Sequence, residues 1–514
     1  MVNDVDVAIA GAGPTGLLLA GDLARAGVSC AVLERRAERS GLSRAFAVHA
    51  RTLEQLDARG AADQLVATGI PVSEFRFFGS GALELSRLPS RFPYVLVTPQ
   101  YETERVLEER ATMLGASIRY GSEVTGFTSH QDAVEVQVRE QDGLTRPLRA
   151  RWLVGADGMH SRVRETLGMP FPGEAVVRSV MLADVRLAET PPDVMTVNAV
   201  GGLFCLIAPF GDGWYRVIAW DRQNQPPEST PVSLEEVREV TRQVLGTDFG
   251  MHDPRWMSRF HSDERQVPSY RADRVLLAGD AAHVHSPAGG QGMNTSIQDA
   301  ANLGWKLAAT VQGWAPAGLL DSYDAERHPV GKQVLRASGA MLRVGLTGPP
   351  TLTGARNLLT TFATRVPFAA RLLTDSVSGI GISYPAPRDA HPLTGKRAAD
   401  VALADSRRLY EALRDGKFVL AADAPVAPDV IDGYGDRVVL AITAAPTGTL
   451  TLIRPDAYIA WAAASAADRP AGQATVWEQA TTDEAALAQH AAEIRSALAR
   501  WCGVPARPAS AAIY

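Results

Sequence analysis

The sequence predicts an α/β fold that begins with a nucleotide-binding strand–turn–helix unit. Apolar residues alternate with small or polar ones from Val5 to Ala10, which indicates a short buried strand. The glycine-rich turn Gly11–Gly16 follows, and residues 17–26 have the composition of a helix. A second strand is predicted from Cys30 and ends at the acidic Glu34. This order of elements is typical of the first unit of a doubly wound sheet.

The glycine-rich turn has the spacing of a site for a dinucleotide pyrophosphate. Gly11 permits a tight turn, Gly13 lets the backbone approach the phosphates, and Gly16 lets the helix pack closely on the strand. Pro14 and Thr15 lie within this turn, and the helix that follows would point its unpaired N–H groups and positive dipole end at the phosphates. A glycine-rich turn without a ligand is the alternative, and the flanking strand and helix count against it.

A second glycine-rich segment, between Gly279 and Asn294, lies far along the chain. Residues 274–278 are predicted to form a buried strand that brings Gly279 and Asp280 to its carboxyl end, where ligands bind in open α/β sheets. The glycines from 289 to 292 let backbone lie against a flat ring, and a long helix is predicted from Asn294. A long cofactor held at both ends explains the two segments, and FAD fits that description better than NAD. Glu34 would then bind the FAD ribose.

Bulk properties exclude several classes of protein. A chain of 514 residues is too long for one core, so about two to four domains are expected. The net charge of −6 argues against nucleic acid as a partner. No uncharged apolar run is long enough to span a bilayer, and Asp4 and Asp6 stand where a signal peptide needs positive charge, so a cytoplasmic enzyme is expected. Cys30, Cys205 and Cys502 lack metal-ligand spacing and are expected to be reduced, buried thiols.

Taken together, four segments resemble the class A, single-component flavoprotein aromatic hydroxylases. More narrowly, the chain is similar to the FAD monooxygenases that tailor or inactivate polycyclic aromatic polyketides, and the resemblance extends over almost the whole chain. The segments are Gly11–Gly16 with Glu34-Arg35, Ser43-Arg44-Ala45 with Arg51-Thr52-Leu53-Glu54, Leu153–Gly158 with Ser161–Arg164, and Arg274–Asn294.

The resemblance implies roles for individual residues. Asp280 would bind the ribityl chain of FAD, and the helix that begins at Asn294 would point its N-terminus at the pyrimidine end of the flavin. Arg44 is similar to a pyrophosphate-contacting arginine, Gln100 to a cofactor-contacting glutamine, and Asp157 to a residue that serves FAD and the nicotinamide donor. Arg44 could equally be an ordinary surface arginine. The predicted cofactor-binding residues are Gly11, Gly13, Pro14, Thr15, Gly16, Glu34, Arg35, Arg44, Gln100, Asp157, Gly279, Asp280, Pro287, Gly290, Gly292, Met293 and Asn294.

The histidines do not predict a metal site. His283 and His285 are separated by one residue, but nothing supplies a third ligand at a sensible spacing, so they are expected to shape the loop beside the flavin. His49 could act as a base, although a core or surface position is the simpler interpretation. No residue can be assigned as the catalytic base from the sequence.

The remaining segments predict three further units. An antiparallel sheet is expected where strand patterns alternate with Gly and Pro clusters, and by resemblance it forms the wall of the aromatic substrate pocket. Phe204, Phe210, Trp214 and Trp220 are the candidates to line this pocket, and one or two of them are expected to touch substrate, the rest being core. The expected division is an FAD-binding domain of residues 1–75, 98–170 and 270–345, a substrate-binding sheet domain of residues 76–97 and 171–269, a helical linker of residues 346–399, and a C-terminal domain of residues 400–514.

The C-terminal domain resembles the thioredoxin-like tail of these hydroxylases, on the basis of Arg454-Pro455-Asp456 with Ala460-Trp461. It contains no cysteine pair, so dithiol chemistry is excluded. A structural role or an assembly surface, such as that of a homodimer, is expected.

The activity that the resemblance implies is hydroxylation of a polycyclic aromatic, polyketide-type substrate. NADPH or NADH would reduce FAD, O2 would add at the flavin C4a, and the hydroperoxide would transfer oxygen to an electron-rich ring. No second GxGxxG follows the first, which fits a nicotinamide donor that docks only transiently. Baeyer–Villiger oxidation of a polycyclic ketone is the closest alternative, and a non-catalytic flavin-binding protein is the alternative from a different class.

Overall fold

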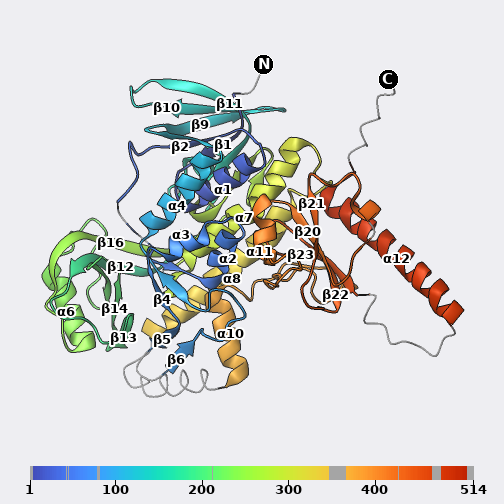
Figure 1. Cartoon of the computed structure of the whole chain (residues 1–514). Helices are drawn as coiled ribbons and strands as arrows, with labels where there is room; N and C mark the ends of the chain where they lie inside the picture. Colours follow the sequence, from blue (N-terminus) through green and yellow to red (C-terminus); the bar gives the residue numbers. More distant parts are fainter. Residues whose placement is uncertain are drawn as a thin grey trace.

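An eight-stranded sheet forms the centre of the nucleotide-binding part of the chain (Figure 1). The computed structural model describes residues 4–41, 43, 45–77, 81–210, 212–286, 288–346, 366–426, 428–465 and 476–505. The strand order is β17-β18-β11-β1-β2-β8, with β10 paired to β11 and β9 to β10. The strands are β1 (Val5–Ala10), β2 (Cys30–Glu34), β8 (Ser117–Tyr120), β9 (Glu123–Ser129), β10 (Val134–Arg139), β11 (Thr145–Gly155), β17 (Arg271–Ala272) and β18 (Val275–Leu277).

Parallel pairing places the glycine segments at one edge of this sheet. β1 runs parallel to β2 and β11, and β11 runs parallel to β18, so the chain leaves all four strands at the same edge. β1, β2 and the strand at 275–277 confirm the predicted buried strands. The helices that pack around this sheet are α1 (Pro14–Arg25), α4 (Gln100–Met113), α5 (Arg162–Thr166), α7 (Gln291–Gln312) and α8 (Ser322–Leu346).

Two helices begin earlier than the composition predicts. α1 starts at Pro14 rather than at residue 17, because a proline at the first helical position loses no intrahelical hydrogen bond. α7 starts at Gln291, three residues before Asn294, because Gly290 adopts a left-handed conformation (φ 63°) that ends the preceding turn.

The predicted antiparallel sheet is present and has six strands in the order β13-β14-β15-β12-β16-β19. Helix α6 (Leu234–Leu245) covers one face, where Cys205 and Val217 pack against Val237. The opposite face carries Phe204 and Trp220, which pack with Phe46 of the nucleotide-binding part. The strands are β12 (Gly173–Arg186), β13 (Thr196–Val200), β14 (Leu203–Pro209), β15 (Tyr215–Asp221), β16 (His252–Gln266) and β19 (His283–Val284).

Two small sheets lie between these parts of the molecule. One has the order β3-β7-β4 and the other is the hairpin β5-β6. β7, at residues 95–97, therefore pairs with β3 and β4 rather than with the six-stranded sheet. Their elements, with the adjacent helices, are β3 (Ala47–Val48), α2 (Ala50–Asp57), α3 (Ala62–Val66), β4 (Ile70–Val72), β5 (Glu74–Phe77), β6 (Gly81–Glu84), β7 (Val95–Val97) and α10 (Pro367–Ser378).

The C-terminal part is a mixed four-stranded sheet with the order β21-β20-β22-β23, in which only β20 and β21 are parallel. It lies on the opposite side of the nucleotide-binding part from the six-stranded sheet (Figure 1). Trp305 of α7 packs edge-on against Phe418 of β20, with ring centroids 5.3 Å apart. The elements are α11 (Leu409–Ala412), β20 (Phe418–Ala422), β21 (Val438–Ile442), β22 (Thr449–Ile453), β23 (Ile459–Ala464) and α12 (Val476–Cys502).

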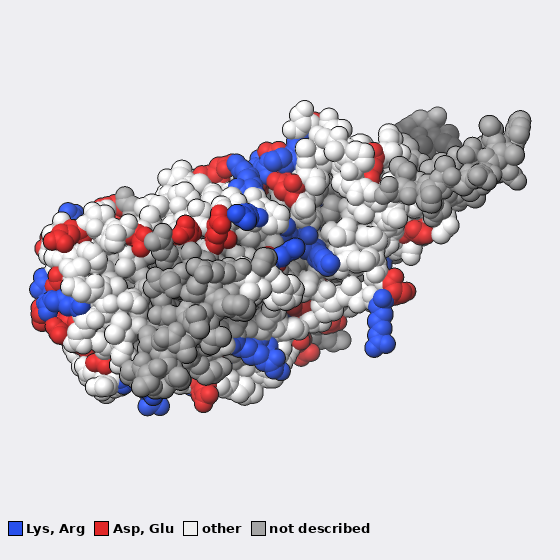
Figure 2. All heavy atoms as spheres, turned by 90° about the horizontal axis from the view of Figure 1, so that it is seen from below, with Lys and Arg blue, Asp and Glu red and all other residues white. Residues whose placement is uncertain are grey.

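The distribution of surface charge and the state of the cysteines are those of an ordinary globular protein. Figure 2 shows acidic and basic side chains interspersed on a mostly uncharged face. Among the described residues, no helix has both the length and the apolar character needed to cross a bilayer. Cys30, Cys205 and Cys502 are free and buried as predicted, and burial raises the pKa of each thiol to about 12.

Candidate active site

Three of the four segments singled out in the sequence meet at the carboxyl edge of the central sheet. A Cβ on Gly11, whose φ is 101°, would lie 2.4 Å from the carbonyl oxygen of Ala156, so the first turn packs directly on the segment that contains Asp157. A Cβ on Gly279 would lie 2.8 Å from Thr15 Oγ1 and 2.9 Å from Ser296 Cβ. Gly279 therefore joins the first turn of α1 to the second turn of α7.

The glycine-rich turn Gly11–Gly16 leaves room for a ligand at the position where the sequence predicts one. A Cβ on Gly13 would meet no heavy atom within 4 Å, and its backbone is extended, with φ −79° and ψ 179°. A Cβ on Gly16, by contrast, would lie 2.0 Å from the carbonyl oxygen of Gly11. Gly16 is thus needed for helix–strand packing, whereas the open side of Gly13 suits close approach of a phosphate. No side chain caps the N-terminus of α1, so its N–H groups can serve an anion.

Glu34 lies at the end of β2 and its carboxylate is held by the backbone of the turn. Oε2 accepts a hydrogen bond from the N–H of Ala12 at 2.9 Å, and Oε1 accepts from the backbone and Nε of Arg36, each at 2.9 Å. Burial acts to raise the pKa of Glu34, but the hydrogen bonds from Arg36 outweigh it and hold the pKa below its ordinary value. Arg36 thus makes the contact to Glu34, whereas the predicted Arg35 has an exposed side chain.

The glycine-rich segment between Gly279 and Asn294 surrounds the N-terminus of α7. A Cβ on Gly290 would lie 3.3 Å from His49 Nε2, and one on Gly292 would lie 3.7 Å from His285 Cε1. The amide of Asn294 is buried and bonds only to backbone: Nδ2 donates to the carbonyls of Ala47 and Gly290, and Oδ1 accepts from the N–H of His49. Its side chain therefore fixes β3 to α7.

Three further side chains near these segments form hydrogen bonds within the protein. Asp157 accepts hydrogen bonds from Ser161 Oγ at 2.5 Å and from the N–H of Val163 at 3.2 Å, and burial raises its pKa. Gln100 Oε1 accepts from the N–H of Ala45, and its Nε2 donates to Glu104. Arg164, in the same segment as Asp157, donates to the carbonyls of Ala281 and Met159.

Met293 is buried in the first turn of α7, and Asp280 is exposed, with Ser296 Oγ 3.4 Å from its Oδ1. Arg44 and Pro287 lie outside the described residues.

A cluster of buried charged side chains, which the sequence did not predict, lies next to the segment between Gly279 and Asn294. Asp299, on α7, accepts hydrogen bonds from the N–H of Gly279 at 3.2 Å, from His283 Nε2 at 2.7 Å and from Arg327 Nε at 2.7 Å. Burial acts to raise the pKa of Asp299, but Arg327 and His283 outweigh it and lower the pKa. The available signal was that Asp299 is the only charged residue between Gln291 and Trp305.

Two histidines beside the segment between Gly279 and Asn294, His49 and His285, have lowered pKa values. Burial lowers the pKa of His49 to about 4, and burial together with His283 lowers the pKa of His285 to about 4. His285 Nδ1 donates to the carbonyl of Ser286, and its ring lies parallel to that of His283, 6.3 Å away. Within the described part of the chain, no group of three or more His, Cys, Asp or Glu side chains could hold a metal ion.

The four aromatic candidates for the substrate pocket fall into two groups. Phe204 and Trp220 are directly paired across β14 and β15 and share an apolar cluster with Phe46, which precedes β3. Phe210 and Trp214 lie at the other end of the sheet and stack with Arg255, whose guanidinium is 5.3 Å and 4.7 Å from their ring centroids. Phe204 and Trp220 therefore pack toward Phe46, whereas Phe210 and Trp214 are engaged by Arg255.

These observations fit FAD. The uncapped N-termini of α1 and α7 flank Gly279, the open side of Gly13 admits a pyrophosphate, and Glu34 at the end of β2 suits a ribose. A cofactor with phosphates in its middle and rings at both ends matches the order in which these protein groups are arranged.

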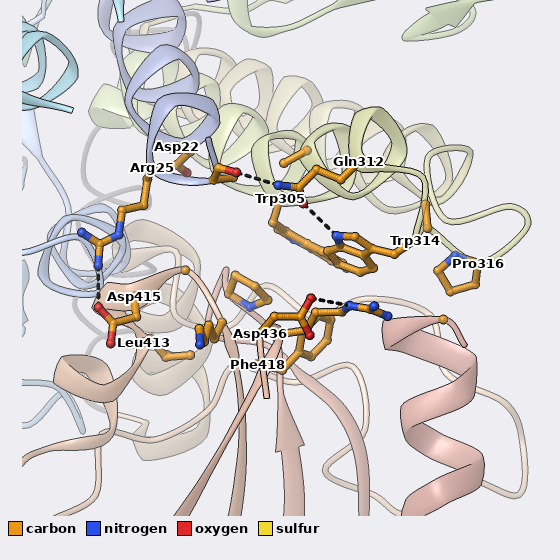
Figure 3. A pocket seen from close by; sticks show the side chains of 18 of the residues that line it. Asp22, Arg25, Trp305, Gln312, Trp314, Pro316, Leu413, Asp415, Phe418 and Asp436 are labelled. Atoms are coloured by element: carbon orange, nitrogen blue, oxygen red, sulfur yellow. Dashed lines mark hydrogen bonds and ion pairs between the residues drawn. The ribbon is translucent and has the colours of Figure 1, made fainter. Parts of the chain in front are cut away.

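A separate cleft of about 1010 Å³ lies between the C-terminal ends of α1 and α7 and the C-terminal part (Figure 3). Trp305, Trp314 and Phe418 contribute to its walls, and Arg25 reaches across one end to Asp415, with 2.5 Å between the charged atoms. None of the predicted FAD-binding residues lines it.

Comparison with known proteins agrees with this site. Residues 4–338 match the family described as "FAD binding domain", and residues 391–505 match "Aromatic-ring hydroxylase, C-terminal". The chain is 40% identical over 466 residues to the rifampicin monooxygenase of Streptomyces venezuelae, covering 89% of this chain and 95% of that protein. It matches the structure of the OxyS anhydrotetracycline hydroxylase from Streptomyces rimosus with a TM-score of 0.82 and 38% identity, over 98% of this chain and 100% of the other. The structure of CabE, an aromatic hydroxylase from angucycline biosynthesis, gives a TM-score of 0.82 and 37% identity with the same coverage.

The FAD-binding family alone accounts for more than half of the chain, and its glycine turns are those that converge at the edge of the central sheet. The chain therefore belongs to the class A FAD-dependent aromatic hydroxylases and is a flavoprotein monooxygenase.

Proposed function

We propose that this monooxygenase hydroxylates a polycyclic aromatic, polyketide-type substrate with NADPH or NADH as the electron donor. The observation that carries the proposal is the apolar cluster of Phe204, Trp220 and Phe46, which lies on the face of the six-stranded sheet opposite α6. A flat, multi-ring substrate gains most from such a surface, because aromatic side chains offer large, rigid contact areas. The names of the relatives, which refer to rifampicin, anhydrotetracycline and angucycline, support the same substrate class.

The residues of the site would hold FAD as follows. The backbone at Gly13 and the N-terminus of α1 would bind the pyrophosphate, Glu34 the adenosine ribose, and Asp280 the ribityl chain, with Gly290 and Gly292 against the ring. Bound FAD supplies the redox chemistry by which a nicotinamide donor and O2 yield one oxygen atom for the substrate. The chain's own part is to orient the aromatic ring, exclude water and stabilise negative charge with the positive end of α7.

The finer domain roles form part of the same proposal. Residues 1–75, 98–170 and 270–345 would act as the FAD-binding domain, and residues 76–97 and 171–269 as the substrate-binding domain. Residues 346–399 would link them to a thioredoxin-like domain of residues 400–514 with a structural or assembly role. A cytoplasmic location and a homodimer stay predictions.

The proposal is tested by NADPH oxidation with FAD-loaded protein, with and without anthraquinone, angucycline, tetracycline and rifamycin compounds. A responding compound should accelerate NADPH oxidation and gain one oxygen atom derived from ¹⁸O2. Hydroxylation and Baeyer–Villiger insertion both add one oxygen, so a ring-deuterated substrate is used to separate them. Loss of the deuterium at the oxidised carbon supports hydroxylation, whereas a ring-expanded product that keeps every deuterium contradicts it.

A pair of variants links the activity to the proposed wall. Trp220→Ala removes the indole of this apolar cluster and should raise the KM for the aromatic substrate about tenfold, because a large apolar contact is lost. Cys205→Ala is the matched control, since Cys205 lies on the adjacent strand but faces α6. Equal effects of the two substitutions would contradict a substrate wall at Trp220.

A further inference from the structure

Asp299 is a fully buried carboxylate that holds both ends of the turn that carries Asp280. Its Oδ2 accepts hydrogen bonds from the N–H of Gly279 at 3.2 Å and from His283 Nε2 at 2.7 Å. Gly279 begins the short turn Gly279–Ala281, and His283 follows shortly after it. The N–H of Ala282 closes the turn by donating to the carbonyl of Gly279. One carboxylate oxygen therefore fixes where this turn begins and where it ends.

The turn cannot easily shift toward the first glycine segment. Gly279 has a φ of 61°, and a Cβ there would lie 2.8 Å from Thr15 Oγ1. The backbone of the turn thus packs against α1 on one side and donates a hydrogen bond to Asp299 on the other. A change at Asp299 would move the turn, and with it Asp280, relative to the open side of Gly13.

Arg327 keeps Asp299 charged and in place. Its Nε donates to Asp299 Oδ1 at 2.7 Å, its Nη2 to the carbonyl of Thr295 at 3.1 Å, and its Nη1 to the hydroxyl of Tyr384 at 3.3 Å. Asp299 and Arg327 have no exposed surface. A buried ion pair contributes little net stability, because desolvation of the charges cancels most of their attraction. An ionised carboxylate can, however, accept three hydrogen bonds at defined positions, which a hydrophobic pair cannot do.

We propose that Asp299, held by Arg327, is a positioning residue for FAD that acts through Asp280 by fixing the turn between Gly279 and His283. The inference rests on the proposed role of Asp280 in FAD binding. It assigns a task in cofactor binding to two residues that have no exposed surface.

The first test is FAD binding to the full-length protein after removal of bound flavin, measured by the change in flavin fluorescence. Asp299→Asn keeps the shape of the side chain but replaces one acceptor by a donor, so one of its three partners is left unpaired. The Kd for FAD should rise about tenfold, the effect of losing one charge-assisted hydrogen bond. Asp184→Asn is the matched control, because Asp184 is equally buried and pairs with buried Arg216 at 2.7 Å but lies in the six-stranded sheet.

The second test separates positioning from a general loss of stability. If Asp299 acts through Asp280, Asp299→Asn should change the Kd little in an Asp280→Ala background, whereas independent effects would add. The visible absorption spectrum of bound FAD should also shift in Asp299→Asn and stay unchanged in Asp184→Asn. Arg327→Lys, which keeps a cation beside Asp299 but loses the contacts to Thr295 and Tyr384, is measured in the same way should Asp299→Asn fail to fold.

The outcomes distinguish this inference from the proposed function. An unchanged Kd in Asp280→Ala means that Asp280 does not bind FAD, and the proposed site fails together with the inference. A raised Kd in Asp280→Ala with an unchanged Kd in Asp299→Asn or Arg327→Lys overturns the positioning role alone. Equal increases in Asp299→Asn and Asp184→Asn, or additive effects in the double variant, overturn it as well.

Discussion

Substitution of Gly13 by alanine should weaken FAD binding without harming the protein that lacks FAD. The backbone at Gly13 is extended, with φ −79° and ψ 179°, and any residue adopts that conformation. An added Cβ would meet no heavy atom within 4 Å. Gly→Ala substitutions at compatible positions stabilise a protein by about 0.4–1 kcal/mol, because they restrict the unfolded chain. The FAD-free variant is therefore expected to unfold at the same temperature as the parent or slightly above it.

FAD binding should change in the opposite direction. The pyrophosphate can accept hydrogen bonds from the N-terminus of α1 only if it lies against the backbone at Gly13, where the new methyl group would stand. A hydrogen bond from a backbone N–H to a charged group contributes about 1.5–3 kcal/mol. Loss of one such bond raises the Kd for FAD roughly 10- to 100-fold.

Fluorescence titration and thermal unfolding of the same preparation measure both effects. Gly126→Ala is the matched control, because Gly126 lies in β9 and its Cβ would also meet nothing within 4 Å. Unchanged FAD affinity in Gly13→Ala would refute a pyrophosphate at this turn. A lower unfolding temperature of the FAD-free variant would refute the inference that the space at Gly13 belongs to a ligand.

Three further predictions concern packing and buried charge. Gly16→Ala places a Cβ 2.0 Å from the Gly11 carbonyl oxygen and should lower the free energy of unfolding by about 1–3 kcal/mol without FAD present, as measured in urea; no loss would mean that α1 can move away from β1. His49 has a pKa of about 4 when folded and about 6.5 when unfolded, so the unfolded chain binds more protons at this residue below pH 6.5. His49 alone should therefore lower the free energy of unfolding by about 2 kcal/mol between pH 7.5 and pH 5. His49→Gln should remove this part of the pH dependence, and an unchanged slope would show that His49 does not cause it. Arg454→Met leaves the buried carboxylates of Glu326 and Asp456 without their arginine and should cost about 3–5 kcal/mol in urea unfolding; a cost below about 1 kcal/mol would contradict the expected penalty for buried charge.

Local sequence patterns predicted those parts of the site whose backbone conformation is determined by residues within the same short segment. The strand at Val5–Ala10, the turn that follows and the strand ending at Glu34 are all encoded within a few residues, by burial periodicity and by glycine. The six-stranded sheet was predicted for the same reason, since alternating strands and turn residues specify antiparallel pairing locally. The fold class therefore followed from short-range information.

Side-chain partners could not be predicted in this way, because they depend on distant packing. The amide of Asn294 bonds to the backbone of Ala47 and His49, about 250 positions away, and nothing near it in the sequence indicates these partners. Asp299 and Arg327 stand 28 residues apart, and neither has a pattern around it that names the other. The contact between Arg36 and Glu34 was not predicted either, because Arg36 lies two residues beyond Glu34, where the chain has already left β2.

The buried charges explain how segments so far apart can form one precise site. Each glycine turn has a defined shape, but its shape does not set its distance from the next turn. That distance is fixed by ion pairs that join helices of the flavin-binding part to one another and to the C-terminal part, such as Arg327 with Asp299 and Arg454 with Glu326. A buried charge is tolerated only where its partner sits at hydrogen-bond distance, so such pairs penalise every other arrangement of the segments. We therefore expect the C-terminal part to matter for FAD affinity although it supplies none of the predicted cofactor contacts.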